Sequence, residues 1–578
     1  MIVNPLIQFS RRYETAIWLT LIMVLVFYLR FKGLTFQSYW FDELFSAYFS
    51  NPEHSLETVV KLTLADVHPP VYQLMMWLSY QLFGYTEWAG RLPSAIAGVL
   101  TVPAMYLLGR ELFNSRVGLY AAALAVPNYY LLYYAQEARS YALLYFLCSL
   151  SFLYFLRVIN SASRLNLVFY IAATLTLLYT HYFGFVLVIA QGLIFVIYIY
   201  STGWPNRPLV TRAVIAAGTI ALVVAPLAPI IARHSAINDF WIPQPETGFL
   251  IHYFQAYFNS GLIAVGILLL ICVAIGGALL KQSSRQIRFG IVALLVWVAV
   301  GYLLPWLRGF TGQPVITDRN TIMLVPPILL LAACGLNLIP KAWLQRFIGA
   351  VLLAYSFYYL FFTVDYYGQV RKNQYREITQ AMSAFEPALP VYTLNHNEEK
   401  YNVYFIQQAS PLLVKDAGIL GTLLEGERPP SLFWLAGGHR YTPKADPGKQ
   451  YGLIEVGRYA YKGTAAALLV NPAVATPLTL ERVEADEAVY VSALLPTPRS
   501  SLKLLIAINE QNQQAFTGVI QLELLNELGD VAYSEAVTQV AVPTILTLGP
   551  EQGAVSLKIT LTTDEFAPTV WLIPAGRD

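Results

Sequence analysis

The chain has 578 residues, of which 56% are hydrophobic and only 12% are charged. Soluble proteins average about 45–50% apolar and about 25% charged residues, so this composition excludes an ordinary soluble enzyme and a disordered chain. The overall net charge of +2 is too small to suggest a nucleic-acid partner. The cysteines Cys148, Cys272 and Cys334 all lie in apolar runs, which gives neither a disulfide framework nor a metal-ligand spacing.

Charge is unevenly distributed along the chain. Residues 1–364 hold 21 Lys and Arg against 12 Asp and Glu, whereas residues 365–578 hold 16 against 23. This shift predicts a membrane domain over 1–364, followed by a more polar C-terminal part.

Eleven apolar runs in the first part are candidates for membrane helices, each of which needs ~20 mostly apolar residues. The first run follows Arg11 and Arg12 and lacks a small-residue cleavage site, which predicts an uncleaved signal anchor. His181 and Gly184 mark a turn that divides the long apolar stretch 165–200 into two helices. The candidates are roughly 15–31, 92–109, 117–134, 140–156, 165–180, 182–200, 213–232, 261–280, 289–306, 320–339 and 347–364.

The placement of Lys and Arg predicts the orientation of these helices. If the N-terminus is cytoplasmic, six short inward-facing segments carry thirteen basic residues and only Glu14 and Glu111 as acids. The outward-facing segments are then 32–91, 233–260, 307–319 and everything after 365.

The expected outer segments have structure of their own. In the loop 32–91, residues 54–65 predict an amphipathic interfacial helix, and the short apolar stretch 70–83 predicts a segment that re-enters or lies on the membrane. Residues 365–440 alternate helix and strand patterns, which predicts a small α/β unit. Residues 441–578 consist mainly of short strands separated by turn residues, which predicts an antiparallel β-sandwich.

The strongest local chemical signal is the run Tyr39-Trp40-Phe41-Asp42-Glu43 in the first outer loop. A carboxylate pair just outside a membrane helix can bind a metal, deprotonate a hydroxyl or simply be solvated. The preceding aromatic residues can raise a carboxylate pKa or form a wall against a sugar. The residues alone leave these alternatives open.

Other charged residues fall at the same expected membrane depth, where charge is costly and usually functional. Taken singly, Glu137 and Arg139 could pair only with each other, and His68 beside two prolines could be a turn residue. Together, acids suited to a general base and arginines suited to phosphate predict a site. The set is Asp42, Glu43, His68, Arg91, Glu137, Arg139, His181 and Arg319.

Several of these residues lie in elements that resemble motifs of the GT-C glycosyltransferases, in the branch containing protein O-mannosyltransferases and the bacterial aminoarabinose transferase of lipid A. The resemblance covers about residues 1–365. Relatives often carry Arg-Tyr where this chain has Arg319-Asn320. The matching elements are Asp42-Glu43, His68-Pro69-Pro70, Arg91-Leu-Pro93-Ser94, Gln136-Glu137-Ala-Arg139-Ser-Tyr141, Thr180-His181-Tyr182 and, similar to a Lys-x-x-Trp-Arg element, Lys372-Asn-Gln-Tyr375-Arg376.

The resemblance implies a polytopic α-helical membrane protein of the GT-C type with about 11 transmembrane helices, an extracytoplasmic α/β unit and a β-sandwich. The implied activity is inverting transfer of a hexose or pentose from a polyprenyl-phosphate-linked donor to a hydroxyl of a protein, lipid or glycan. The implied location is the bilayer of a bacterial plasma membrane, with the N-terminus cytoplasmic and the reaction on the outer face.

The resemblance also implies roles for single residues. Asp42 is the expected general base, and Glu43 is expected to orient Asp42 or bind sugar. A divalent metal ion held by Asp42, Glu43 and His68 is left open, and no other cofactor is expected. The donor phosphate is assigned to Arg91, Arg139 and Arg319, and substrate contacts or structural support to Tyr39, Trp40, His68, Glu137, Tyr141 and His181.

Two other functions stay open at the level of sequence. A transporter or flippase of a lipid-linked saccharide would also have many helices and buried charges, although the halves of this chain show no symmetry and its polar residues gather at one face. A non-catalytic envelope assembly protein could use a large outer domain, but it would not need Asp42. Consumption of a polyprenyl-phosphate sugar would distinguish a transferase from both.

Overall fold

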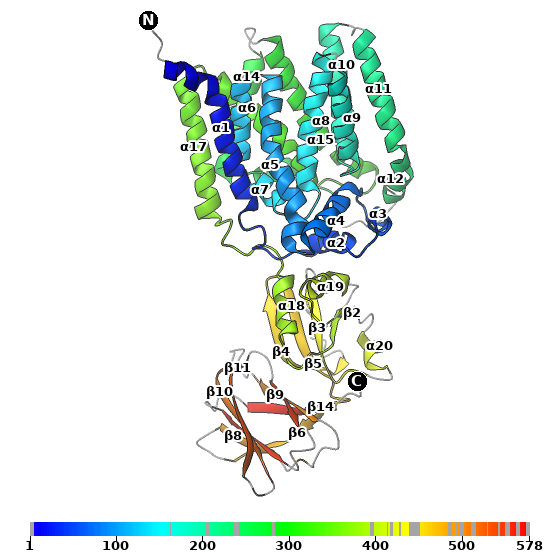
Figure 1. Ribbon diagram of the computed structural model, residues 1–578, viewed down its shortest axis with the longest axis vertical. Helices are drawn as coiled ribbons and strands as arrows, with labels where there is room; N and C mark the ends of the chain where they lie inside the picture. Colours follow the sequence, from blue (N-terminus) through cyan, green and yellow to red (C-terminus); the bar gives the residue numbers. More distant parts are fainter. Residues whose placement is uncertain are drawn as a thin grey trace. The chain divides into compact units, whose positions relative to one another are not determined.

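A computed structural model of the chain describes residues 5–573, apart from short internal gaps, as two compact units (Figure 1). The helical unit consists of Met1–Phe36 and Phe49–Gln369. The C-terminal unit consists of Gln37–Tyr48 and Val370–Asp578. The gaps are residues 162, 204–206, 236–241, 280–283, 394–397, 413, 417–419, 427–428, 439–450, 484–487, 493–494, 496–501, 510–515, 527, 529, 541–543, 549–554 and 562–566.

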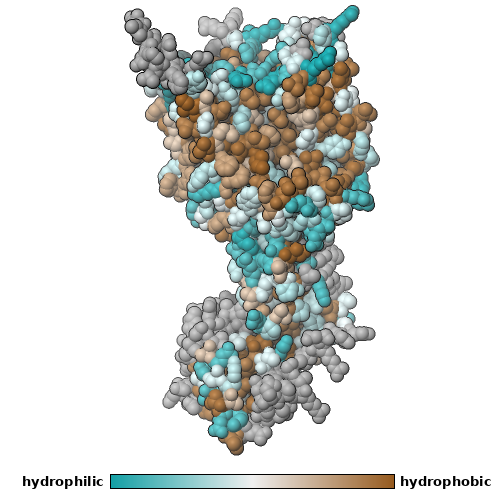
Figure 2. Space-filling view, in the orientation of Figure 1, coloured by the Kyte–Doolittle hydropathy of each residue, from teal (hydrophilic) through white to brown (hydrophobic). Residues whose placement is uncertain are grey.

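The helical unit is a bundle in which 9 helices of the described residues are long and apolar enough to cross a membrane. Figure 2 shows a broad apolar band across this bundle, as a surface in contact with lipid requires. The spanning elements are α1 (Pro5–Phe31), α5 (Glu87–Leu112), α8 (Tyr141–Asn160), α10 (Gly184–Thr202), the run of α11 (Arg207–Val224), η1 (Ala225–Leu227) and α12 (Ala228–Ser235), α14 (Gly261–Leu279), α15 (Arg285–Thr311), η2 (Asn320–Leu324) with α16 (Val325–Leu338), and α17 (Ala342–Tyr358) with η3 (Tyr359–Thr363).

All eleven expected runs contain helix, but two are shorter than expected. The run at 165–180 is α9 (Arg164–Leu178), a helix of 15 residues, which is about 22 Å long. The run at 117–134 is broken into α6 (Ser115–Ala125) and α7 (Tyr129–Ala135). Pro127 lies at the break and lacks the N–H that a continuous helix needs. The next residue, Asn128, starts α7 by accepting the backbone N–H of Leu131 at 2.9 Å.

A buried arginine from another helix closes the broken end of α6. The Arg30 side chain of α1 is 1% exposed, and its guanidinium donates to the carbonyls of Ala125 at 3.1 Å and Val126 at 3.0 Å. Carbonyls at a helix C-terminus have no partner within the helix. Arg30 therefore satisfies acceptors that the break at Pro127 would otherwise leave unbonded.

Two short helices of the expected outer loop belong to the helical unit and lie at one end of the bundle (Figure 1). The first, α3 (Leu56–Ala65), begins where the Ser55 hydroxyl accepts the backbone N–H of Thr58. The second, α4 (Val71–Phe83), follows the two prolines after His68. The helix α3 confirms the helix expected at 54–65. The stretch 70–83 is helical as well, and its expected place in or on the membrane stays a prediction. A further short helix, α13 (Phe249–Ala256), precedes α14.

The C-terminal unit begins with an α/β region built on a five-stranded sheet in the order β2-β1-β3-β5-β4. The first three strands pair in parallel, and β5 pairs antiparallel with both β3 and β4. The elements are α18 (Tyr375–Ser383), β1 (Val391–Thr393), α19 (Glu398–Gln407), β2 (Val414–Asp416), α20 (Leu420–Leu424), β3 (Leu432–Gly438), β4 (Ile454–Tyr461) and β5 (Thr464–Val470).

This sheet corrects the expected boundary near residue 440. The expected β-sandwich, 441–578, includes β4 and β5, but β5 lies between β3 and β4 in the α/β sheet. Every residue of β5 is buried, as expected for an interior strand with a continuous apolar sequence. The α/β region therefore extends to Val470.

The remaining strands form the two antiparallel sheets that the sequence predicted. Their orders are β11-β10-β13-β8-β7 and β12-β9-β14-β6. Leu504 and Ile506 of one sheet share a buried core with Ile520 and Leu557 of the other, so the two sheets pack face to face. The strands are β6 (Thr476–Leu478), β7 (Leu480–Arg482), β8 (Ala488–Ser492), β9 (Leu502–Asn509), β10 (Phe516–Leu525), β11 (Val531–Val540), β12 (Thr544–Leu548), β13 (Ser556–Leu561) and β14 (Ala567–Ile573).

Candidate active site

The acidic pair lies at the start of α2 (Phe41–Phe49), and the segment that carries it, 37–48, belongs to the C-terminal unit. Glu43 forms an ion pair with Lys372, with 2.8 Å between Oε2 and Nζ. Their side chains are only 0% and 4% exposed. The backbone N–H of Trp40 also donates to Glu43 Oε2 at 3.3 Å. The Glu43 carboxylate is thus held by a cation and by the backbone at the start of its own helix.

Helix α19 of the α/β region also contacts the segment 37–48. The Tyr404 hydroxyl accepts the backbone N–H of Tyr39, and the two rings lie 6.1 Å apart. The buried ammonium of Lys400 lies 4.7 Å from the ring centre of Phe41 and 4.4 Å from that of Phe45, which is within the range of cation–π attraction. The α/β region therefore fixes the helix that carries the predicted base.

The two carboxylates of the pair differ in environment. Glu43 is fully buried and bonded to Lys372, whereas Asp42 is half-buried. A carboxylate that neutralises a buried ammonium is a poor proton acceptor, because protonation would leave the cation uncompensated. Of the two carboxylates, Asp42 is the more exposed, and its role as the base stays a prediction.

In the helical unit, the predicted site residues His68 and Arg139 form a short hydrogen-bonded chain with Asp66. His68 Nδ1 lies 2.8 Å from a carboxylate oxygen of Asp66, and His68 Nε2 lies 3.0 Å from a terminal nitrogen of Arg139. An arginine can only donate, so Nε2 accepts and Nδ1–H donates to Asp66. Burial raises the Asp66 pKa, but the His68 hydrogen bond and the Arg139 charge outweigh burial and lower that pKa to about 2.

His181 lies beside this chain. Its ring centre is 6.4 Å from that of His68 and 5.9 Å from that of Tyr141. Burial and, after it, the neighbouring His68 and Arg139 lower the His181 pKa to about 3. His181 Nδ1 accepts the backbone N–H of Phe183 at 3.2 Å, which a neutral ring can do. His181 is therefore a neutral imidazole with its Nε2–H as donor.

The motif that contains Arg91 and Ser94 is hydrogen-bonded to the backbone of Arg139. Ser94 Oγ donates to the backbone carbonyl of Arg139 at 3.0 Å and lies 2.8 Å from the Tyr72 hydroxyl. Arg91 itself is 1% exposed and donates to the carbonyl of Leu34 at 2.8 Å. The backbone N–H of Arg139 bonds to the carbonyl of the buried Glu137 at 2.8 Å. The Arg-x-Pro-Ser and Gln-Glu-x-Arg-x-Tyr elements are thus joined.

A row of tyrosines leads from this cluster toward Arg319. Tyr141, Tyr134, Tyr130 and Tyr257 are successive neighbours, with ring centres 5.0, 4.8 and 5.3 Å apart. The Tyr257 hydroxyl donates to Thr321 Oγ1 at 2.7 Å. Thr321 lies in η2, which Arg319 precedes directly. Arg319 is half-buried, and its backbone N–H is held by the Asp318 carboxylate at 2.9 Å.

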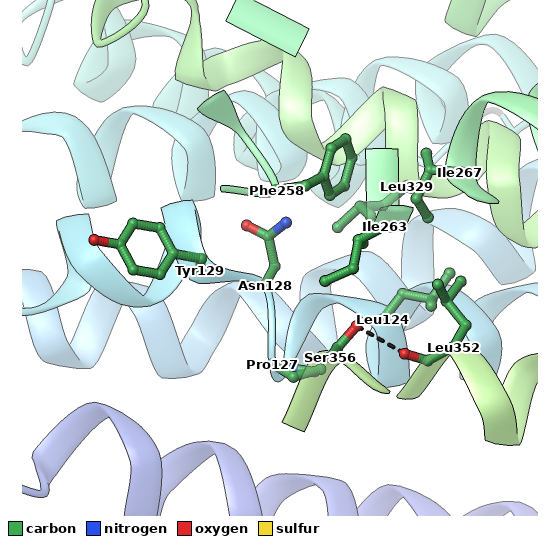
Figure 3. Close-up of a pocket in the computed structure, with 10 residues that line it drawn as sticks. All are labelled: Leu124, Pro127, Asn128, Tyr129, Phe258, Ile263, Ile267, Leu329, Leu352 and Ser356. Atoms are coloured by element: carbon green, nitrogen blue, oxygen red, sulfur yellow. Dashed lines mark hydrogen bonds between the residues drawn. The ribbon is translucent and has the colours of Figure 1, made fainter. Parts of the chain in front are cut away.

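An apolar pocket beside the broken helix is too small to serve as a substrate chamber (Figure 3). Asn128 and Tyr129 line it from the break, and Phe258 and Ser356 from neighbouring segments. Its volume of about 10 Å³ is what one water molecule needs. The pocket is a packing seam at the break, and no ligand is assigned to it.

The structure brings together some of the predicted site residues but not all. His68, Glu137, Arg139, Tyr141 and His181 are linked by the contacts above within the helical unit. Arg91 and Arg319 are connected to them through Ser94 and the tyrosine row. Asp66, Lys372, Lys400 and Tyr404 were not predicted as site residues. The acidic pair with Tyr39 and Trp40 belongs to the other unit, so one site containing all of them stays a prediction.

Two of the three donors expected to hold a metal ion, Glu43 and His68, are already engaged. Within the part of the chain that the structure describes, no three His, Cys, Asp or Glu side chains form a group that could hold a metal. Both nitrogens of His68 are hydrogen-bonded, and Glu43 carries Lys372. These residues do not fit a metal site as they stand, and no chemical step is derived through one.

Comparison with known proteins agrees with this architecture. The family described as dolichyl-phosphate-mannose-protein mannosyltransferase matches residues 67–230, a range that includes His68, Arg91, Arg139 and His181. The solved structure of apo ArnT from Cupriavidus metallidurans is 14% identical and covers 79% of this chain and 98% of its own, with a TM-score of 0.56. This chain has the fold of a GT-C glycosyltransferase. The predicted resemblance and fold class are confirmed.

A second ArnT structure from the same organism, bound to undecaprenyl phosphate, is similar to the same extent. It is 15% identical and covers 78% of this chain and 98% of its own, with a TM-score of 0.54. No curated protein is similar enough in sequence to match the chain. The GT-C fold and, among the described residues, nine helices long and apolar enough to cross a membrane make the chain an integral membrane protein.

Replacing Lys372 with methionine is expected to destabilise the protein strongly, because Glu43 would be left as an uncompensated buried charge. Breaking a buried pair typically costs roughly 3–5 kcal/mol, so the thermal midpoint in detergent should fall by several degrees. The double variant Glu43→Gln/Lys372→Met should regain most of the loss. A control is Lys558→Met, which breaks the more exposed pair with Glu523 and should cost under about 1 kcal/mol. Equal effects of both lysine changes would contradict this account.

His181 should make the protein sensitive to acid. An unfolded histidine binds a proton below about pH 6.5, whereas folded His181 stays neutral until about pH 3. The stability contributed by neutral His181 is therefore complete above pH 6.5 and lost as the pH falls toward 3, by roughly 2 kcal/mol at pH 5. His181→Gln should flatten the decline of thermal stability between pH 7 and 5. Replacing the exposed His252 in the same way should leave the decline as steep as in the wild type.

Proposed function

We propose that the chain is an inverting glycosyltransferase, which moves a hexose or pentose from a polyprenyl-phosphate donor to a hydroxyl of a protein, lipid or glycan. The observation that carries the proposal is the Arg139–His68 contact at 3.0 Å, in a chain with the fold of ArnT, which binds undecaprenyl phosphate in its solved structure. The match to a family named for transfer of mannose from dolichyl phosphate to protein supports the same reaction class.

In the proposed reaction the acceptor oxygen attacks C1 of the sugar as the bond between C1 and the phosphate oxygen breaks. Asp42 accepts the hydroxyl proton, and the electron pair of the broken bond leaves on the polyprenyl phosphate. Attack opposite the leaving group inverts C1. A phosphate is a good leaving group once its charge is stabilised, so the arginines need only neutralise it and no acid catalyst is required.

The arginines are not equivalent in this scheme. Arg139 lies in the histidine cluster and Arg319 is half-buried beside η2, so both are suited to grip phosphate oxygens with paired N–H groups. Arg91 is almost completely buried and already bonds to a main-chain carbonyl. We assign the phosphate first to Arg139 and Arg319, and to Arg91 a role that is largely structural.

The proposed site faces the outer side of the membrane. The support is the charge at the opposite end of the bundle, where the chain between spanning helices carries Arg110, Arg116, Arg157 and Arg164 with Glu111 as an acid. Positively charged loops remain on the cytoplasmic side during insertion. Lipid-linked sugars consumed on the outer face would then be the donors.

Asp42→Asn is expected to abolish sugar transfer in the folded protein, because an amide keeps the shape of the side chain but cannot accept a proton. Loss of a general base typically lowers the rate by ~10²–10⁴-fold. The assay is release of polyprenyl phosphate by native membranes that contain the protein and supply the acceptor, starting with polyprenyl-phosphate mannose and extending to other hexoses and pentoses. The exposed Asp530→Asn variant is the matched control. Failure of the wild type with every donor would refute the transferase, and an active Asp42→Asn variant would refute only the base.

The orientation can be tested with single cysteines in a Cys272→Ser background, in which Cys148 and Cys334 are buried. Leu528, which is 86% exposed in the C-terminal unit, is expected to react as Leu528→Cys with an impermeant maleimide in intact cells. Ser201→Cys, at the end of α10, should react only after the membrane is opened. The reverse labelling pattern would move the proposed site to the cytoplasmic side.

A further inference from the structure

The hydrogen-bonded chain from Asp66 through His68 to Arg139 has a defined direction. Arginine donates to His68 Nε2 at 3.0 Å, so the imidazole proton must be on Nδ1, where it is 2.8 Å from the Asp66 carboxylate. Despite burial, the hydrogen bond from His68 and the charge of Arg139 lower the pKa of Asp66, so its carboxylate is ionised at neutral pH. A carboxylate that accepts from one nitrogen of a histidine fixes its tautomer and the direction of its other nitrogen.

The surrounding contacts hold both ends of this chain in place. On the histidine side, Pro69 and Pro70 restrict the backbone, and the next residue, Val71, donates its N–H to the carbonyl of Tyr179 at 3.1 Å. On the arginine side, the carbonyl of Arg139 accepts the Ser94 hydroxyl. The rings of His68 and His181 meet edge to face at 77°. The imidazole therefore has little freedom to turn away from Arg139.

We propose that Asp66 and His68 are positioning residues that fix the direction of the Arg139 guanidinium for the donor phosphate. The inference rests on the proposed function, since it takes phosphate as the ligand of Arg139. The guanidinium has five N–H donors in a planar fork. Holding one terminal nitrogen against His68 restricts the orientation of that fork before the phosphate arrives, which lowers the entropy cost of binding.

This role separates His68 from two others that its residue type allows. As a metal ligand or a general base, His68 would need a nitrogen with a lone pair directed at the ion or the hydroxyl. Nδ1 carries the proton that Asp66 accepts, and the Nε2 lone pair receives the Arg139 N–H. His68 thus acts through Arg139 and does not itself touch the reacting atoms.

The test is a double-mutant cycle on binding of undecaprenyl phosphate to the full-length protein in detergent, followed by intrinsic tryptophan fluorescence. His68→Ala is expected to weaken binding about tenfold, the effect of one lost charge-assisted hydrogen bond. Arg139→Ala should weaken binding at least as much. The double variant should bind no more weakly than Arg139→Ala alone, because His68 has nothing left to position. His252→Ala, an exposed histidine of the same unit, should bind as the wild type does.

A second variant protects the test against misfolding. Asp66→Asn keeps an acceptor for Nδ1–H but removes the charge, so it should weaken binding several-fold, and this loss should also vanish in an Arg139→Ala background. Losses that multiply instead would show that His68 contacts the ligand or supports the fold independently, and would overturn the inference. The inference would also be overturned if His68→Ala or Asp66→Asn bound with wild-type affinity while Arg139→Ala lost affinity. The proposed function would stand in that case. A wild type that binds no undecaprenyl phosphate would overturn the phosphate-binding proposal and this inference together.

Discussion

The buried ion pair between Glu43 and Lys372 is the constraint on which the arrangement of the predicted base depends. Moving two charges from water into a protein interior costs several kcal/mol for each ion, and the cost is offset only while the two remain together. The pair joins positions that are separated in sequence by almost the whole helical bundle. Helix α2 therefore cannot leave the segment after the last spanning helix without exposing an uncompensated charge, and Asp42 is carried by the C-terminal unit.

The sequence predicted the helices well because each needs only a local property, a run of apolar residues about as long as a bilayer is thick. The same criterion missed the break at Pro127, since a proline does not interrupt an apolar run. It also misplaced β4 and β5. Their residues, such as the Ala-rich run of β5, fit either sheet, and the partner of a strand is decided by contacts with distant segments.

For the site, the sequence predicted residue types and their common depth but not their partners. His68, Arg139, His181 and Tyr141 do gather, as the alternating topology of the helices required. Asp66 has no signal of its own, because a two-residue spacing from His68 says nothing about which side chains bond. The sequence assigned the donor phosphate to Arg91 and Arg139 alike, because it does not show that the Arg91 side chain is buried and bonded to a main-chain carbonyl. Lys372 belongs to an element that resembles a family motif, but only the fold shows that it pairs with Glu43.

The arginine that closes the broken helix α6 also imposes an order on how the protein is built. Helix α1 is only 17% buried over its apolar stretch, and a guanidinium in a membrane helix is costly until it finds acceptors. Those acceptors, the carbonyls of Ala125 and Val126, are synthesised about a hundred residues later. The guanidinium of α1 therefore has no helix-end acceptors until α6 has been synthesised, and the two helices are joined once these hydrogen bonds form.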